Sequence, residues 1–375
     1  MSTAIDTIRE SFEDFSSNIG DYRIDRNKLH GVHEIIFLTL CGLICGCEGW
    51  RDIERYGKTK IDFLRTFFEY RHGIPSDDTL RLFFRNINPK KFSTAFLEWT
   101  QTIDLKNNKH IAIDGKVSRH SFDGEDKPLH VVSAFASECR LVLAQEKVSE
   151  KSNEITAIPA LLEVLDVEGS IVTIDAMGCQ KEIAERIRNK NADYVLSLKG
   201  NQGTLHQATA SLFQEEKILQ KYKPDTIITV DGNEHGRIET RECRVIQAPK
   251  ILLKDHDWDG LQTLVEVKST REIKGVRSEE RRYFLSSLPP KAEAISQAIR
   301  AHWSIENSLH WVLDVTFRED DSRIRKGNAP QNIAIMRHAA LNMLQKTKQN
   351  RESIKQLRKA AGWDNTQLFR VLSNI

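Results

Sequence analysis

The sequence lacks the patterns that mark disulfide-stapled, zinc-ribbon and repeat proteins. None of its six cysteines forms a Cys-x2-Cys pair, and three of them, Cys41, Cys45 and Cys47, crowd into one apolar segment. A disulfide framework or a zinc ribbon is therefore not expected, and a reducing cytoplasm suits the chain better. We also find no internal repeat and no low-complexity segment.

Long hydrophobic runs are missing as well. The most apolar stretch, residues 35–47, includes Thr39 and two glycines, and it is shorter than the roughly 20 residues that cross a bilayer. We expect it to form a buried helix. The first ten residues contain no apolar core of a signal peptide. These absences predict a cytoplasmic protein with no membrane partner.

The overall charge is small, but it is unevenly distributed. The 375 residues are 29% charged and 39% hydrophobic, with a net charge of +2, which is ordinary for a globular chain of roughly two or three domains. Residues 323–375 hold 11 Lys and Arg against only Glu352 and Asp364. This basic end fits a phosphate-binding surface, and it fits a solvated helical tail equally well.

Three carboxylates stand in informative local contexts. Asp114 ends the apolar run 110–113, Asp175 ends the run 170–174, and Glu306 lies in a helical pattern over 301–311. Aspartates at strand ends commonly form turns, and a glutamate on a helix commonly faces solvent. Brought together, however, the three could hold two divalent metal ions, an arrangement that suits cleavage and transfer of phosphodiesters.

The order of the predicted elements indicates how these carboxylates meet. Strands are expected over 110–113, 128–135 and 140–145, then a helix over 154–165, a strand over 170–174, a helix over 180–190 and a strand over 193–198. This is the order of a ribonuclease-H-like domain, an α/β fold with a mixed sheet. The first and fourth strands are neighbours in that fold, which would place Asp114 beside Asp175.

The flanking regions differ from this core. Residues 1–105 are predicted to be helical, with helices over 29–43, 52–68, 76–84 and 89–99, and they fit either a helix-turn-helix-like DNA module or a supporting bundle. Residues 203–290 are predicted to form a β-rich insertion: a helix over 204–219, strands over 226–230, 238–246, 261–270 and 280–286, and a turn at 231–233. We therefore predict four units, comprising 1–105, the catalytic core 106–202 with 291–345, the insertion 203–290, and a basic helical tail 346–375.

Several motifs, taken together and in order, resemble one family. They are Ile113-Asp-Gly-Lys116, Glu150-Lys-Ser-Asn-Glu154, Asp175-Ala-Met-Gly-Cys-Gln180, Lys199-Gly-Asn-Gln202, His235-Gly-Arg237 and His302-Trp-Ser-Ile-Glu-Asn-Ser-Leu-His-Trp311. Over nearly its whole length the chain resembles bacterial insertion-sequence transposases of the DDE type, in particular the H-repeat-associated group found with Rhs elements. The resemblance implies that Asp114, Asp175 and Glu306 are the catalytic, metal-binding triad.

The resemblance also implies the reaction and its partners. The expected activity is metal-dependent cleavage and strand transfer of insertion-sequence ends, in cut-and-paste transposition, with Mg²⁺ as cofactor and Mn²⁺ as a substitute. The expected partners are double-stranded DNA, both terminal inverted repeats and target, and a second copy of the chain in the DNA complex. The expected location is the nucleoid in the bacterial cytoplasm. A non-mobile ribonuclease-H-like endonuclease and a domesticated DNA-binding protein remain alternatives.

Nine basic side chains are candidates for DNA contact, although each also fits a turn, a solvated hairpin or simple packing. They are Lys116, Lys199, His235, Arg237, Arg241, His302, Arg323, Arg325 and Lys326. Related enzymes often carry a Tyr-x2-Arg-x3-Glu-x6-Lys signature, and Ile299, His302 and Leu313 stand in its place here. The spacing of His302, Glu306 and His310 on one helical face also permits a zinc site.

Overall fold

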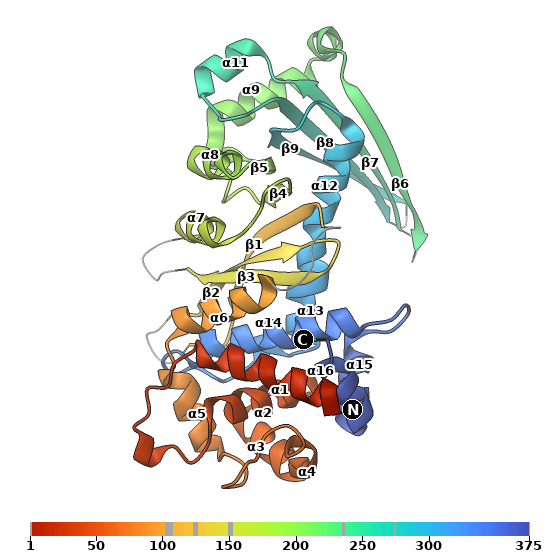
Figure 1. The fold of residues 1–375 in the computed structure, drawn as a ribbon. Coiled ribbons are helices and arrows are strands. Elements are labelled where there is room, and N and C mark those ends of the chain that lie inside the picture. The colour runs from red at the N-terminus through yellow and green to blue at the C-terminus, as the bar shows by residue number, and fades with distance from the viewer. Residues whose placement is uncertain are drawn as a thin grey trace.

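The structure is a computed structural model that describes residues 2–101, 108–122, 127–148, 153–234, 237–273 and 275–374. The molecule is elongated (Figure 1), with helices from both ends of the chain at one end and a long sheet at the other. In the described residues, no helix is both long and apolar enough to cross a membrane.

The first five strands form the predicted ribonuclease-H-like arrangement. The chain runs β1 (His110–Ser118), β2 (Leu129–Ala136), β3 (Leu141–Lys147), α7 (Glu154–Val164), β4 (Ile171–Ile174), α8 (Lys181–Asn189) and β5 (Asp193–Leu198). Their order across the sheet is β3-β2-β1-β4-β5. β1 pairs antiparallel with β2 and parallel with β4, so the prediction that the first and fourth strands are neighbours is confirmed.

One strand is longer than the sequence pattern indicates. β1 continues past the apolar run to Ser118, so Asp114 lies within the strand and opposite Ser133 of β2. Pairing with β4 nevertheless stops at Ile113 and Ile174. Because β4 is much shorter than β1, Asp114 is the first residue of β1 that has no partner in β4.

The β-rich insertion extends the same sheet. After α9 (Gly203–Gln214) and α10 (Glu216–Leu219), the chain forms β6 (Asp225–Glu234), β7 (Arg237–Gln247), α11 (Lys250–His256), β8 (Thr263–Ile273) and β9 (Val276–Ser286). β9 pairs with β5, and the nine-stranded sheet continues as β9-β8-β7-β6. The turn expected at 231–233 is wrong, because β6 runs through these positions to Glu234 with an irregular register against β7.

The helices of the two chain ends share one core. The N-terminal helices are α1 (Ser2–Ser17), α2 (Val32–Ile44), α3 (Trp50–Thr59), α4 (Ile61–Leu64), α5 (Asp77–Asn86) and α6 (Pro89–Gln101). They pack around α14 (Ala329–Thr347), and the chain ends in α15 (Ile354–Trp363) and α16 (Asn365–Leu372). α2 is buried over most of its length, as its apolar sequence predicts. Part of the C-terminal positive charge is structural, since Arg337 and Arg358 are buried.

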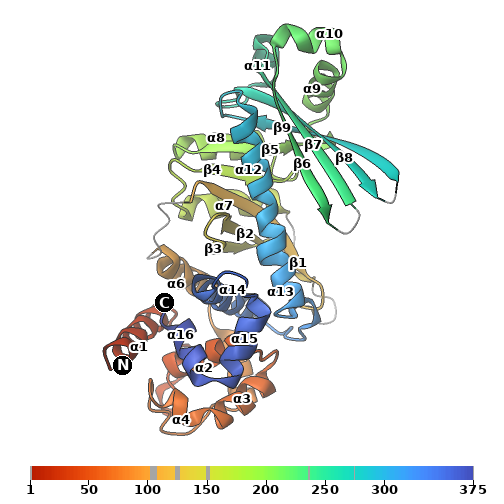
Figure 2. The same ribbon diagram turned by 90° about the vertical axis from the view of Figure 1, so that its right-hand side faces the viewer.

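A single long helical segment crosses the sheet on the face opposite α7 and α8 (Figures 1 and 2). It comprises α12 (Ala292–Ile305), a π-helical turn labelled η4 (Glu306–His310) and α13 (Trp311–Val315). A short 3₁₀ turn, η5 (Glu319–Asp321), follows. Isolated π turns inside helices frequently occur at functional sites, and this one begins at Glu306.

Candidate active site

The sheet brings Asp114 and Asp175 together. Each follows a residue of the last parallel pair, Ile113 opposite Ile174, so the two aspartates lie side by side where the pairing of β1 with β4 ends. Asp114 Oδ1 accepts a hydrogen bond from the Gly115 N–H at 2.9 Å. Asp175 Oδ1 accepts the Met177 N–H at 2.9 Å, which is the turn geometry expected of an aspartate after a strand. In both carboxylates, one oxygen is thus held by the backbone.

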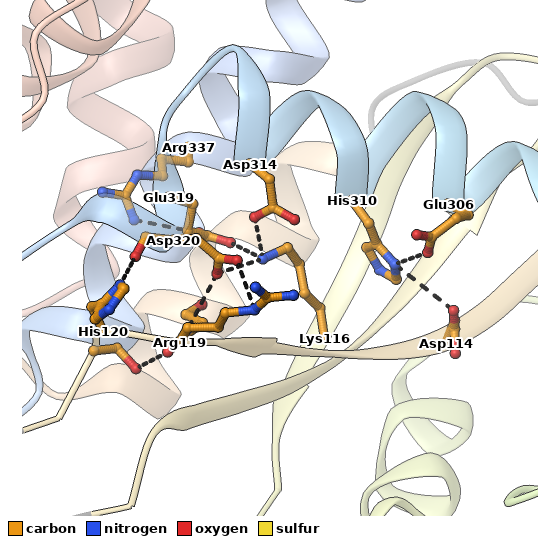
Figure 3. A network of polar contacts seen from close by, with 12 residues as sticks. Asp114, Lys116, Arg119, His120, Glu306, His310, Asp314, Glu319, Asp320 and Arg337 are labelled. Carbon is orange, nitrogen blue, oxygen red and sulfur yellow. Dashed lines mark hydrogen bonds and ion pairs between the residues drawn. The ribbon is translucent and has the colours of Figure 1, made fainter.

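The π turn brings a third carboxylate and an imidazole to Asp114. His310 Nδ1 lies 3.0 Å from Glu306 Oε2 and 3.8 Å from Asp114 Oδ2. Figure 3 shows the ring between the two carboxylates. His310 is buried, and its other ring nitrogen, Nε2, has no hydrogen-bond partner in the described part of the chain. Among the described residues, the His310 ring therefore has polar contacts with Glu306 and Asp114 through Nδ1.

A cavity of about 340 Å³ opens beside these residues. Asp114, Asp175 and Glu306 all line it, so the fold places the three carboxylates around one cavity. The cavity is also lined by Lys199, after β5, and by Arg282, on β9. Arg282 lies over the ring of Trp303 at 5.2 Å from its centroid. Acidic and basic side chains both line the cavity, a combination suited to an anionic substrate that is held through bound cations and by direct contacts.

Burial and crowding shift the ionisation of these acids. Burial raises the pKa of Asp114 to about 6, and the nearby carboxylates of Asp175 and Glu154 add to this, whereas His310 opposes it. Burial, reinforced by Glu154, also raises the pKa of Asp175. The hydrogen bond with His310 instead lowers the pKa of Glu306. Opposed shifts among neighbouring titratable groups are typical of catalytic sites.

The donor groups fit divalent metal ions. Within the described residues, two sets of ligand atoms each lie within 4.8 Å of one another: Asp114 with Glu306 and His310, and Asp114 with Glu154 and Asp175. Carboxylate oxygens are the ligands that Mg²⁺ and Mn²⁺ prefer. Asp114 belongs to both sets, so it lies where one carboxylate could bridge two ions.

Glu154 was missed as a site residue from the sequence. It belongs to the motif Glu150-Lys-Ser-Asn-Glu154, and only the fold shows that its carboxylate approaches Asp114 and Asp175. The sequence held one signal that could have identified it: the motifs 113–116, 150–154 and 175–180 each contain an acidic residue.

The zinc hypothesis for His302, Glu306 and His310 is not supported. His302 Nδ1 lies 3.0 Å from the Thr173 hydroxyl, and His302 joins neither candidate metal group among the residues described. Its side chain lines the cavity, and burial lowers its pKa to about 4. A contact between His302 and a phosphate would therefore come from a neutral imidazole.

Lys116 is placed behind the cavity rather than in it. Its side chain is only 11% exposed, and Nζ lies 2.6 Å from Asp314 Oδ1 and 3.2 Å from Glu319 Oε2 (Figure 3). Asp320 lies farther from Nζ, at 3.6 Å. These three acids already neutralise the ammonium group, which favours a structural role for Lys116 over a contact with DNA.

The remaining candidate cations lie in different places. Arg323, Arg325 and Lys326 line a second groove, of about 670 Å³, together with Trp50 and Arg51 of α3. Arg241, on β7, pairs with Asp231 and lies 2.8 Å from Glu239. His235 and the side chain of Arg237 fall outside the described residues. The structure therefore gathers Lys199 and His302 at the carboxylates and the 323–326 segment at a separate groove.

Comparison with known proteins identifies the family of the chain. The family described as "Transposase DDE domain" matches residues 106–343, and the family described as "DDE_Tnp_1-associated" matches residues 13–100. The chain belongs to the DDE transposase family, which confirms the family suggested by its motifs, and it is a transposase with DNA as its partner.

Similar proteins cover nearly the whole chain. It is 42% identical over 372 residues to "Putative transposase YncI" of Escherichia coli O157:H7, covering 97% of this chain and 95% of that one. It is 40% identical over 365 residues to "H repeat-associated putative transposase YhhI" of Escherichia coli K12, covering 95% and 96%. Among solved structures, a piggyBac transposase synaptic complex with hairpin DNA matches with 10% identity and a TM-score of 0.40, covering 97% of this chain and 78% of that one.

Proposed function

We propose that this transposase cleaves DNA at the ends of its own insertion sequence and joins the freed ends to target DNA, in a metal-dependent cut-and-paste reaction. The observation that carries the proposal is the convergence of Asp114, Asp175 and Glu306 on one cavity. Carboxylates from two strands and one helix, shared between two metal positions, suit in-line attack on a phosphodiester.

Mg²⁺ is the proposed cofactor, with Mn²⁺ as a substitute. Asp114, Asp175 and Glu306 would hold the ions, which would activate the attacking water or 3′-hydroxyl and stabilise the leaving oxygen. The side chains around them orient the DNA. Lys199 lines the cavity and is the proposed phosphate contact. Arg282 lines it too but is paired with Glu280 at 2.8 Å, and His302, which lies 3.0 Å from the Thr173 hydroxyl, offers a neutral ring.

We propose that the surface outside the cavity binds duplex DNA. This DNA comprises the inverted repeats at the ends of the element and the target DNA. The groove lined by Arg323, Arg325 and Lys326 supports this assignment, because cationic side chains gather there outside the cavity. Holding two ends at once requires two active sites, so we propose a homodimer in the DNA complex. The expected location is the bacterial nucleoid in the cytoplasm.

The test is strand cleavage of the DNA that flanks the gene, end-labelled and incubated with purified protein and Mg²⁺. We expect nicks at discrete positions, and joined products once a target plasmid is added. Asp175→Asn should bind the same DNA and leave it intact. Nicks without joined products would instead indicate a non-mobile endonuclease. Binding without nicks in the unsubstituted protein would indicate a domesticated DNA-binding protein.

A further inference from the structure

A fourth carboxylate approaches the catalytic aspartates from the other face of the sheet. Glu154 is the first residue of α7, and the Asn153 side chain caps this helix by accepting the Ile155 N–H at 3.1 Å. α7 packs on the face of the sheet opposite α12 (Figure 1), through Ile158 and Leu161. The Glu154 side chain is 13% exposed, so it does not simply project into solvent.

Gly115 makes this approach possible. Neighbouring residues of a strand face opposite sides of the sheet, so position 115 faces α7, whereas position 114 faces α12. A Cβ atom at position 115 would collide with the Glu154 carboxylate and would lie 2.8 Å from His130 Nε2. The carboxylate therefore occupies the space that any other residue at 115 would fill, and it reaches past β1 towards Asp114.

His130 fixes the orientation of Glu154. Its Nε2 lies 2.8 Å from Glu154 Oε1, and β2, which carries His130, pairs with β1 beside Gly115. One Glu154 oxygen is thus tied to an imidazole from the sheet. Carboxylates that bind metal ions are commonly held in place by hydrogen bonds from neighbouring side chains.

We propose that Glu154 is a fourth carboxylate ligand of the metal centre, with Asp114 bridging two ion positions: one shared with Asp175 and Glu154, the other with Glu306. His130 is then a positioning residue for Glu154. The inference rests on the proposed function, since it assigns a ligand to the same centre. It accounts for the placement of three acids within 4.8 Å of one another, where without a cation their charges repel.

The alternative is a structural role, in which Glu154 serves only His130 and the N-terminus of α7, where a negative charge is favourable. The two roles differ in metal affinity. We would titrate the full-length protein with Mn²⁺ and follow free Mn²⁺ by electron paramagnetic resonance, comparing the unsubstituted chain with Glu154→Gln. The matched control is Glu163→Gln, an exposed acid farther along α7.

We expect two bound Mn²⁺ ions in the unsubstituted protein and in Glu163→Gln. Glu154→Gln should weaken one of them at least tenfold while circular dichroism shows an intact fold. Glu154→Asp, which keeps the charge but shortens the side chain, should weaken the same ion. If Asp175→Asn loses Mn²⁺ but Glu154→Gln binds as the unsubstituted protein does, the ligand role of Glu154 is overturned and the metal centre stands. If the unsubstituted protein binds no Mn²⁺, with or without flanking DNA, both proposals fail.

Discussion

The Lys116 ammonium lies 2.6 Å from the Asp314 carboxylate, and this contact joins the strand that carries Asp114 to the helical segment that carries Glu306. Lys116 follows Asp114 by two residues on the same face of β1, and Asp314 follows Glu306 by eight residues. Buried Glu319 and Arg337 complete the network at 3.3 Å from each other (Figure 3). The network therefore fixes how the helix lies across the strand, and with it the separation of the Asp114 and Glu306 carboxylates.

Lys116→Met should destabilise the fold and slow cleavage while sparing DNA affinity. Removal of one partner leaves buried acids without their cation, which typically costs about 3 kcal/mol. Urea unfolding should show this loss, and the single-turnover cleavage rate should fall more than tenfold. The control is Arg119→Met, which removes a mostly exposed cation that also contacts Asp320. If the main defect of Lys116→Met is weaker DNA binding, Lys116 instead contacts a DNA phosphate.

Asp114→Asn should stabilise the metal-free protein at pH 8 while abolishing cleavage. Burial and the carboxylates of Asp175 and Glu154 raise the pKa of Asp114 to about 6, so its ionised form is disfavoured in the folded chain. A group with a raised pKa contributes stability at low pH and loses it as the pH rises through the folded value. Removing the charge should therefore add about 1–3 kcal/mol at pH 8 and nothing below pH ~4. Thermal melts in EDTA at both pH values measure this.

Addition of Mg²⁺ should stabilise the unsubstituted protein more than Asp114→Asn. Mg²⁺ should raise the melting temperature of the unsubstituted protein, because a ligand that binds only the folded state stabilises it. The same addition should leave Asp114→Asn nearly unchanged. Equal Mg²⁺ stabilisation of both proteins would place the ions elsewhere.

Acid should weaken the fold through buried histidines. Burial on α14 lowers the pKa of His338 from 6.5 to about 4. As the pH falls below 6.5, this histidine therefore becomes protonated in the unfolded chain but stays neutral in the folded chain. Such a group contributes stability above pH 6.5 and loses it as the pH falls towards 4. Between pH 7.5 and pH 5 the loss should be about 2 kcal/mol for this residue. His338→Leu should show a correspondingly smaller loss in urea unfolding, and an unchanged pH dependence would contradict this.

Arg323→Gln should weaken DNA binding without affecting the metal centre. Arg323 lines the groove beside α3, and each phosphate contact that is lost should lower the slope of log affinity against log salt by about 1. The comparison is Lys359→Gln, an exposed cation on α15. Fluorescence anisotropy with flanking duplex DNA at several salt concentrations measures both. Equal effects of the two substitutions would mean that the groove is not the contact surface.

Much of the core could be predicted from local patterns. Buried parallel strands are nearly continuous apolar runs, so residues 110–113, 170–174 and 193–198 were recognisable. The aspartates that end the first two runs then fell on neighbouring strands, because the order of elements determined the topology. Glu306 could be placed on a helix, but the direction of its side chain could not be predicted, because the sequence pattern does not reveal the π-helical turn that begins there.

Other features depend on distant contacts that the sequence does not reveal. Lys116 is an ordinary basic residue in the sequence, and its burial follows from acids about 200 residues later. β1 extends past Asp114 because β2 pairs with it there. The insertion joins the core sheet through β5 and β9, a pairing that strand patterns alone do not specify. The role proposed for Glu154 likewise depends on the missing side chain at Gly115.

The most direct test of the metal centre is the rescue of Asp175→Cys by a change of metal. A thiolate is a poor ligand for Mg²⁺ but a tolerable one for the softer Mn²⁺. The account predicts cleavage of flanking DNA by the unsubstituted protein with either ion, and cleavage by Asp175→Cys with Mn²⁺ only. Full activity of Asp175→Cys with Mg²⁺ would contradict the assignment of Asp175 as a metal ligand.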